Sequence, residues 1–177
     1  MSLPAPTIIE TPRLTLRPPT ADDVSVFDEM HRDPEVMQYL TVVGSHGGFS
    51  AAWRTVALLV GHWAMLGYGQ WVVVERASAQ TVGRVGLWNP PGWPGLEVSW
   101  MIRRSHWGRG LATEAARASM DHAFAVVKAD HVISIIRPDN ARSIRVAQKL
   151  GEVFERSEMM DGKEYHIYGA SRNGHQV

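Results

Sequence analysis

The stretch HWGRGLATEA, residues His106 to Ala115, places two glycines immediately before a helix-forming run. A helix N-terminus carries unpaired N–H groups and a partial positive charge. Glycine lets an anion approach such groups because it has no Cβ in the way. The stretch therefore predicts a strand-to-helix turn that either holds a phosphate group or is only a tight connection. Both interpretations are compatible with the spacing.

Two well-known phosphate loops do not fit this stretch. A P-loop ends in Gly-Lys-Ser or Gly-Lys-Thr, and the stretch has no such ending. A dinucleotide-binding fingerprint would begin at Gly108, but Thr113 stands where its third glycine belongs. A nucleotide-binding protein is therefore a disfavoured interpretation, and the anion site requires a different family.

The elements around the stretch form a strand–helix–strand unit. Residues 96–102 (LEVSWMI) and 131–137 (HVISIIR) are typical of strands. Between them, apolar residues at helical spacing extend the helix to about Val127. Asn140 then precedes a helix that Gly151 ends. A strand–helix–strand unit implies one parallel pair of strands.

The rest of the chain predicts antiparallel strands and further helices. The β-branched runs 70–76 and 81–88 are joined by a short turn, and Asp161-Gly162 predicts a terminal hairpin. The other expected elements are a strand at Thr11–Pro18, a helix capped by Thr20, a short helix from Asp33 to Leu40, a loop at Gly44–Ser50, and an apolar helix at Ala51–Leu66 capped by Ser50. We therefore predict one domain over residues 1–177, an α+β fold with a mixed, mostly antiparallel central sheet flanked by helices.

Composition narrows the classes of function. The 177 residues include no cysteine, so the chain has no disulfide, thiolate metal site or cysteine nucleophile. The formal net charge is zero, which argues against a nucleic-acid partner. No apolar run reaches the length of a membrane span and no signal-peptide pattern is present, so we expect a cytoplasmic protein without a membrane partner. The eight histidines show no metal-ligand spacing, so we expect no metal.

Four segments carry a resemblance to a known family. The run EVSWMIRRSHWGRGLATEAARASMDHAF (97–124), followed by IRPDNARSIRVAQKLG (136–151), is similar to the GNAT superfamily of N-acetyltransferases, and within it to the RimJ/RimL-like branch. The opening TPRLTLRPPTADDV (11–24) and the closing DGKEYHIYG (161–169) resemble the same branch. The family's pyrophosphate loop, Gln/Arg-x-x-Gly-x-Gly/Ala, falls on residues 107–112, with Trp107 departing from its first position.

The resemblance implies acetyl-CoA as the acyl donor. The pyrophosphate is then expected on backbone N–H groups of the glycine loop, and the pantetheine arm along the preceding strand, where the family's sheet splays into an open strand pair. The residues implied in cofactor binding are Met101, Ile102, Arg103, Trp107, Gly108, Arg109, Gly110, Leu111, Ala112, Thr113, Asn140 and Ser143. Homodimers are common in this branch, so the resemblance also makes a homodimer an expectation.

Glu97 and Ser143 are the candidate catalytic residues. Glu97 matches a glutamate often found on this strand in the branch, and apolar neighbours would raise its pKa toward that of a general base. The alternative is a solvent-facing or salt-bridged strand residue. Ser143 is the candidate proton donor to the departing sulfur. Its alternative roles are helix capping and a CoA contact without proton transfer.

The predicted reaction is transfer of an acetyl group from acetyl-CoA to a primary amine by direct attack on the thioester. The acceptor is either the N-terminal α-amine of a protein or a small-molecule amine such as a polyamine, an amino acid or an aminoglycoside. A different class of protein, a non-catalytic acyl-CoA-binding or regulatory module with the same fold, is the alternative. The intact spacing of Glu97, Gly110, Asn140 and Ser143 favours an enzyme.

Several other side chains carry structural expectations. Glu152 stands where the family usually has phenylalanine, and we expect Val153 and Phe154 to take over that packing. Trp53 and Trp63 are expected in the core. Two further tryptophans, Trp88 and Trp93, are assigned equally to the core or to a wall of the acceptor pocket. His122 and His166 are expected to pack or to lie on the surface, and Tyr165 and Tyr168 are expected to pack.

Overall fold

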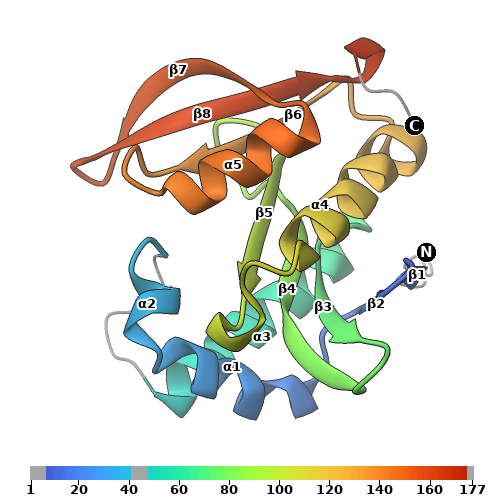
Figure 1. Cartoon of the computed structure of the whole chain (residues 1–177). Helices are drawn as coiled ribbons and strands as arrows, with labels where there is room; N and C mark the ends of the chain where they lie inside the picture. The colour runs from blue at the N-terminus through green and yellow to red at the C-terminus, as the bar shows by residue number, and fades with distance from the viewer. Residues whose placement is uncertain (1–6, 41–47, 175–177) are drawn as a thin grey trace.

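The computed structural model describes residues 7–40 and 48–174 and builds them around one eight-stranded sheet (Figure 1). The spatial order of the strands is β1-β2-β3-β4-β5-β6-β8-β7. Their bounds are β1 (Ile9–Glu10), β2 (Leu14–Arg17), β3 (Gln70–Glu75), β4 (Gln80–Trp88), β5 (Glu97–Ile102), β6 (His131–Ile136), β7 (Val153–Met160) and β8 (Lys163–Ser171). Among these neighbouring strands β5 and β6 are parallel and the other pairs are antiparallel, so the predicted mixed α+β sheet is confirmed.

Helices cover both faces of this sheet. They are α1 (Val24–His31), α2 (Pro34–Met37), α3 (Phe49–Leu66), α4 (Leu111–His122), which a π-helical turn extends through Ala123–Val127, and α5 (Ala141–Leu150). The main core lies between α4 and one face of β2–β6, and a second core lies between α1, α3 and the other face. Within the described ranges, no helix is both long and apolar enough to cross a membrane.

The sheet opens between β5 and β6. β4 and β5 pair from Gly83–Ile102 to Trp88–Glu97, whereas β5 and β6 pair only at Glu97 and Ile133. Beyond that position the strands diverge, which confirms the splayed strand pair. Figure 1 shows the β6, β8 and β7 half with α5 at the top of the molecule and the β2–β5 half below it.

The apolar helix α3 differs from its prediction in two respects. It begins at Phe49 with Gly48 at its N-cap, so Ser50 is not the cap; residues 44–47 of the expected loop lie outside the described residues. Trp53 is 58% exposed, so its core assignment is wrong, whereas Trp63 is buried and donates its indole N–H to the Gln70 carbonyl (2.9 Å). A helix that is apolar on every side gives no local signal for the face that packs.

The end of α5 overturns the expectation for Glu152. Glu152 is only 3% exposed, whereas Val153 is 65% and Phe154 52% exposed. Gly151 takes the left-handed conformation (φ 88°), and the Glu152 N–H donates to the Ala147 carbonyl at 3.0 Å. This reversal is a Schellman motif, in which the side chain after the glycine turns back toward the last helical turn. Glu152 therefore occupies the inward position itself.

Two glycines test these backbone assignments in opposite directions. We predict that Gly151→Ala lowers the free energy of unfolding by about 1 kcal/mol, because a Cβ is strained at positive φ. Gly61 lies inside α3 with open space around its Cβ position, so Gly61→Ala should raise stability by about 0.5–1 kcal/mol. Urea denaturation of both variants measures the difference, and a stabilised Gly151→Ala would contradict the assigned turn.

Candidate active site

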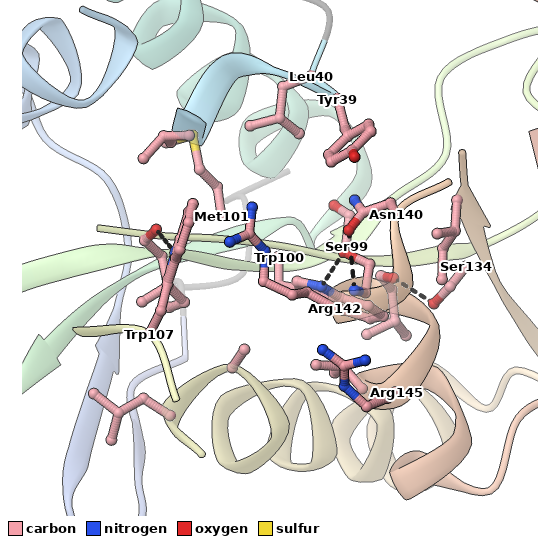
Figure 2. A pocket seen from close by; sticks show the side chains of 18 of the residues that line it. Tyr39, Leu40, Ser99, Trp100, Met101, Trp107, Ser134, Asn140, Arg142 and Arg145 are labelled. Atoms are coloured by element: carbon pink, nitrogen blue, oxygen red, sulfur yellow. Dashed lines mark hydrogen bonds between the residues drawn. The ribbon is translucent and has the colours of Figure 1, made fainter. Parts of the chain in front are cut away.

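A cavity of about 350 Å³ lies where β5 and β6 diverge (Figure 2). Its walls come from β5, the loop before α4, β6, α5 and the end of the α2 region. Of the residues predicted in the sequence, those that line it are Glu97, Met101, Ile102, Trp107, Gly108, Gly110, Leu111, Ala112, Asn140 and Ser143. The fold therefore brings most of the predicted site into one cleft.

Arg103, Arg109 and Thr113 are not among the lining residues. The Arg103 guanidinium donates to Glu29 (2.7 Å), and the Arg109 guanidinium pairs with Glu75. Both cations are thus engaged by carboxylates outside the cleft.

The glycine loop has the backbone shape of a tight turn and also opens on the cleft. Gly108 (φ 75°) and Gly110 (φ 77°) both adopt the left-handed region, and Gly110 is the N-cap of α4. A Cβ at Gly108 would meet only open space within 4 Å. The first N–H groups of α4 have no partner within the helix, so they are available to an anion in the cleft.

Thr11 and Arg13, in the segment just before β2, hold this loop in place. The Glu114 carboxylate, in the first turn of α4, accepts hydrogen bonds from the Thr11 hydroxyl (2.7 Å) and from the backbone and Nε of Arg13 (2.9 and 2.6 Å). Arg13 also donates to the Arg109 carbonyl at 2.8 Å. Sequence reasoning missed Arg13 because its partners are about a hundred residues away along the chain.

The backbone of β5 alternates between its two neighbours. The Met101 carbonyl lies against Gly83 of β4, and the Arg103 N–H donates to the Val82 carbonyl (2.8 Å). The Ile102 carbonyl faces the other way and accepts the Trp107 indole N–H at 2.7 Å. By the alternation of a strand, the backbone of Trp100 also points into the opening.

One wall of the cleft belongs to α5 and carries positive charge. Arg142, Arg145 and Lys149 line it, and the Arg142 guanidinium lies 4.0 Å above the Trp107 ring (Figure 2). This cation–π contact joins α5 to the glycine loop across the cleft. Arg142 was not among the predicted site residues, because its spacing from Trp107 follows no local pattern.

Asn140 and Ser143 form the N-terminus of α5. The Asn140 side-chain carbonyl caps the helix by accepting the Ser143 N–H (3.1 Å). The Trp100 indole donates to the Ser143 hydroxyl oxygen at 3.2 Å (Figure 2). That oxygen accepts from the indole, so the Ser143 hydroxyl keeps its own proton to donate to another group.

Glu97 lies at the closed end of the cleft, beside the last paired position of β5 and β6. Its carboxylate accepts the Trp93 indole N–H (2.8 Å) and the backbone N–H of Ile135, and the side chain is buried. Burial raises the pKa of Glu97 to about 7, against the lowering effects of the Trp93 hydrogen bond and the Arg84 charge. A carboxyl group with this pKa can accept a proton near neutral pH.

The structure gives Trp93 and Trp88 different surroundings. Trp93 contacts the candidate base directly through its indole N–H. Trp88 stacks on His62 with ring centroids 4.6 Å apart, on the face of the sheet that packs against α1 and α3. Packing is confirmed for His122, which meets Trp71 edge to face and is 7% exposed, and for Tyr168, which is 8% exposed.

Polar groups that could bind a metal do not gather in the described ranges. No cluster of three or more histidine, aspartate or glutamate side chains suitable for a metal ion occurs within residues 7–40 and 48–174.

Comparison with known proteins agrees with this geometry. The sequence model of a family described as "Acetyltransferase (GNAT) domain" matches residues 13–153. The chain is similar to the crystal structure of an acetyltransferase from Agrobacterium tumefaciens, with a TM-score of 0.82 and 25% identity over 94% of this chain and 95% of that one. RimJ from Mycobacterium smegmatis, solved in complex with CoA-disulfide, shares the fold with a TM-score of 0.75 and 18% identity over 89% and 81% of the two chains.

A curated relative with an assigned substrate matches part of the chain. The spermidine N(1)-acetyltransferase of Escherichia coli K12 is 35% identical over 77 residues, which are 44% of this chain and 40% of the relative. The matched family model covers most of the sequence. The chain therefore belongs to the GNAT family, and it is an acetyltransferase. Acetyl-CoA is the acyl donor of that family, and the solved structures that share the fold include RimJ.

The Trp93 hydrogen bond makes the pKa of Glu97 testable. We predict that Trp93→Phe raises the pKa of Glu97 above about 7, because the ionised carboxylate loses a donor at 2.8 Å. A hydrogen bond to a charged group contributes about 1.5–3 kcal/mol, which corresponds to a shift of roughly one to two pKa units. Carbon NMR titration of the glutamate carboxyls measures the pKa of Glu97. Trp53→Phe, at an exposed position of α3, is the control. An unchanged pKa would contradict the assigned contact.

Proposed function

We propose that this acetyltransferase transfers the acetyl group of acetyl-CoA to a primary amine, with Glu97 as the general base. The observation that carries the proposal is the buried Glu97 carboxyl, with a pKa of about 7, in the same cleft as the N-termini of α4 and α5. The cleft thus combines a proton acceptor that works near neutral pH with a place for an anionic donor.

The residues present fit the donor. Backbone N–H groups from about Trp107 to Thr113 would hold the pyrophosphate, since they open at the N-terminus of α4. The positively charged wall of α5 would face the phosphates. Trp100 and Ile102, whose backbone groups face the opening, would pair with the pantetheine arm as an added strand would. Of the three predicted strand residues, Ile102 keeps this role, and Trp100 takes it in place of Met101 and Arg103.

Acetyl-CoA supplies an activated acetyl group, whose thioester carbon forms the new bond to the amine nitrogen while the bond to sulfur breaks. Glu97 takes the proton that the amine loses, directly or through a water. Ser143 donates a proton toward the departing sulfur; its oxygen accepts the Trp100 indole N–H, and its own proton remains for donation. In this assignment Asn140 orients Ser143 by capping α5.

The pKa of the acceptor decides how much the base contributes. An alkyl amine with a pKa of about 10.4 is mostly protonated at pH 7, and its neutral form costs about 4–5 kcal/mol. An α-amino group with a pKa near 8 costs only about 1 kcal/mol. A buried base therefore favours an alkyl amine as the acceptor, and the partial match to a spermidine acetyltransferase supports the same class. An N-terminal α-amine is the second candidate.

Binding of the donor is the first test of this function. We predict that Gly110→Glu weakens acetyl-CoA binding by roughly tenfold or more, because a carboxylate at the α4 N-cap repels the pyrophosphate. Gly162→Glu is the matched control: it adds the same charge at the same backbone conformation (φ 74°) in the β7–β8 turn. Titration calorimetry compares the three proteins, and a folded wild type that does not bind acetyl-CoA would overturn the proposal.

Removing the base is the second test. We predict that Glu97→Gln lowers kcat for an alkyl amine by roughly 10²–10⁴-fold while acetyl-CoA binding is kept, because glutamine cannot accept the proton. In the wild type, kcat/KM should rise with pH through about 7 as the Glu97 carboxyl ionises. A screen of alkyl amines and peptides with free N-termini identifies the acceptor. Acetyl-CoA binding without turnover of any amine would indicate a non-catalytic module instead.

A further inference from the structure

The Ser134 hydroxyl lies between two oxygen atoms at the point where the sheet opens. Its oxygen is 2.8 Å from the Val98 carbonyl oxygen of β5 and 3.0 Å from Oε1 of Glu152 (Figure 2 shows Ser134 and the bond to β5). A hydroxyl has one proton to donate, and a carbonyl oxygen has none. Both contacts are hydrogen bonds only when Glu152 brings the second proton and donates it to Ser134.

The surroundings of Glu152 agree with a neutral carboxylic acid. The residue is 3% exposed, and its Oε2 has no hydrogen-bond partner among the described residues. An ionised carboxylate with an oxygen left bare in the interior would be costly. Burial, together with the nearby charges of Glu97 and Glu155, raises the pKa of Glu152 to about 8.

This contact lies at the apex of the strand opening. The last main-chain pairing between β5 and β6 is at Glu97 and Ile133. Immediately beyond it, side chains make the connections: Ser134 donates to Val98, and the Glu97 carboxylate accepts the Ile135 N–H. The hydroxyl bond therefore fixes the separation of the two strands next to the proposed base.

We propose that Glu152 is a positioning residue of the acetyl-transfer site: as a neutral acid it donates to Ser134, directs the Ser134 proton to the Val98 carbonyl, and so holds β5 to β6 beside Glu97. The inference rests on the proposed function of Glu97. If Glu152 ionises, its carboxylate becomes the stronger acceptor and draws the Ser134 proton to itself. The Val98 carbonyl then loses its partner, and the strands lose the tether.

The charges that act on Glu152 come from two strands. Glu97 faces it from β5 and Glu155 from β7, and both disfavour its ionisation. Glu155 in turn contacts His131 of β6 at 2.7 Å. The proton on Glu152 should therefore be lost only in mildly alkaline solution.

The pH dependence of the reaction separates this role from simple packing. In the wild type, kcat should rise as Glu97 ionises near pH 7 and fall again as Glu152 ionises above about pH 8. In Glu152→Gln the side-chain amide still donates to Ser134 and does not titrate, so the alkaline fall should disappear. Glu152→Met keeps the volume but has no donor, and kcat should fall by roughly three- to tenfold with little change in the KM for acetyl-CoA.

Ser134→Ala provides the control for the connection. Without the hydroxyl, the tether to Val98 is absent whatever the state of Glu152, so adding Glu152→Gln to Ser134→Ala should leave the pH profile unchanged. A fall of kcat at alkaline pH in Glu152→Gln would overturn the inference. So would a change in the pH profile of kcat that Glu152→Gln causes equally in the wild type and in Ser134→Ala. Thermal unfolding of each variant confirms that the proteins compared are folded.

A spectroscopic measurement keeps the inference separate from the proposed function. Infrared difference spectra of the wild type against Glu152→Gln should show a protonated carboxyl band at pH 7 that the variant lacks. Absence of that band would overturn the neutral acid even in an active enzyme. Presence of the band in a protein that binds acetyl-CoA but acetylates no amine would refute the catalytic assignment of Glu97, and with it the positioning role.

Discussion

The separation of β5 from β6 after one paired position is the constraint on which the rest of the site depends. A parallel pair normally continues along both strands, but here the ladder stops at Glu97 and Ile133. Side chains replace the missing strand: the Ser134 hydroxyl and the Trp107 indole each bind a β5 carbonyl. The remaining main-chain groups face a cleft that also receives the N-termini of α4 and α5, so one interruption creates a strand edge beside two helix N-termini.

The same opening explains how charge is arranged. The two carboxyl groups with raised pKa, Glu97 and Glu152, lie near its closed end, where burial favours their neutral forms. The cationic side chains of Arg142 and Arg145 line the wall formed by α5. The proposed function thus places the anionic donor at the helix ends and proton transfer at the buried carboxyl groups. In this proposal the role of each charged side chain follows from its distance from the point where β5 and β6 separate.

Much of the fold follows from local patterns. Hydrophobic periodicity, Asp161-Gly162 and the glycines before α4 predict the order of the elements and the single parallel step, and the structure confirms them. The errors in α3 lie where the local pattern does not show which residue caps the helix or which side of it packs. Ser50 stands next to the cap without being it, and Trp53 lies on the exposed side of a helix that is apolar throughout. Which side packs depends on the partners, and these come from distant parts of the chain.

The sequence by itself determined the turn before α4, the helix cap at Asn140 and the strand position of Glu97, because each depends on residues a few places apart. The tertiary structure decided which backbone groups of β5 face the cleft and which side chain contacts the Ser134 hydroxyl. Glu152 follows it by 18 residues and reaches it only because the left-handed turn at Gly151 directs the side chain inward beneath β6. A contact of that kind is created by the packing of α5 against the sheet, and no local spacing encodes it.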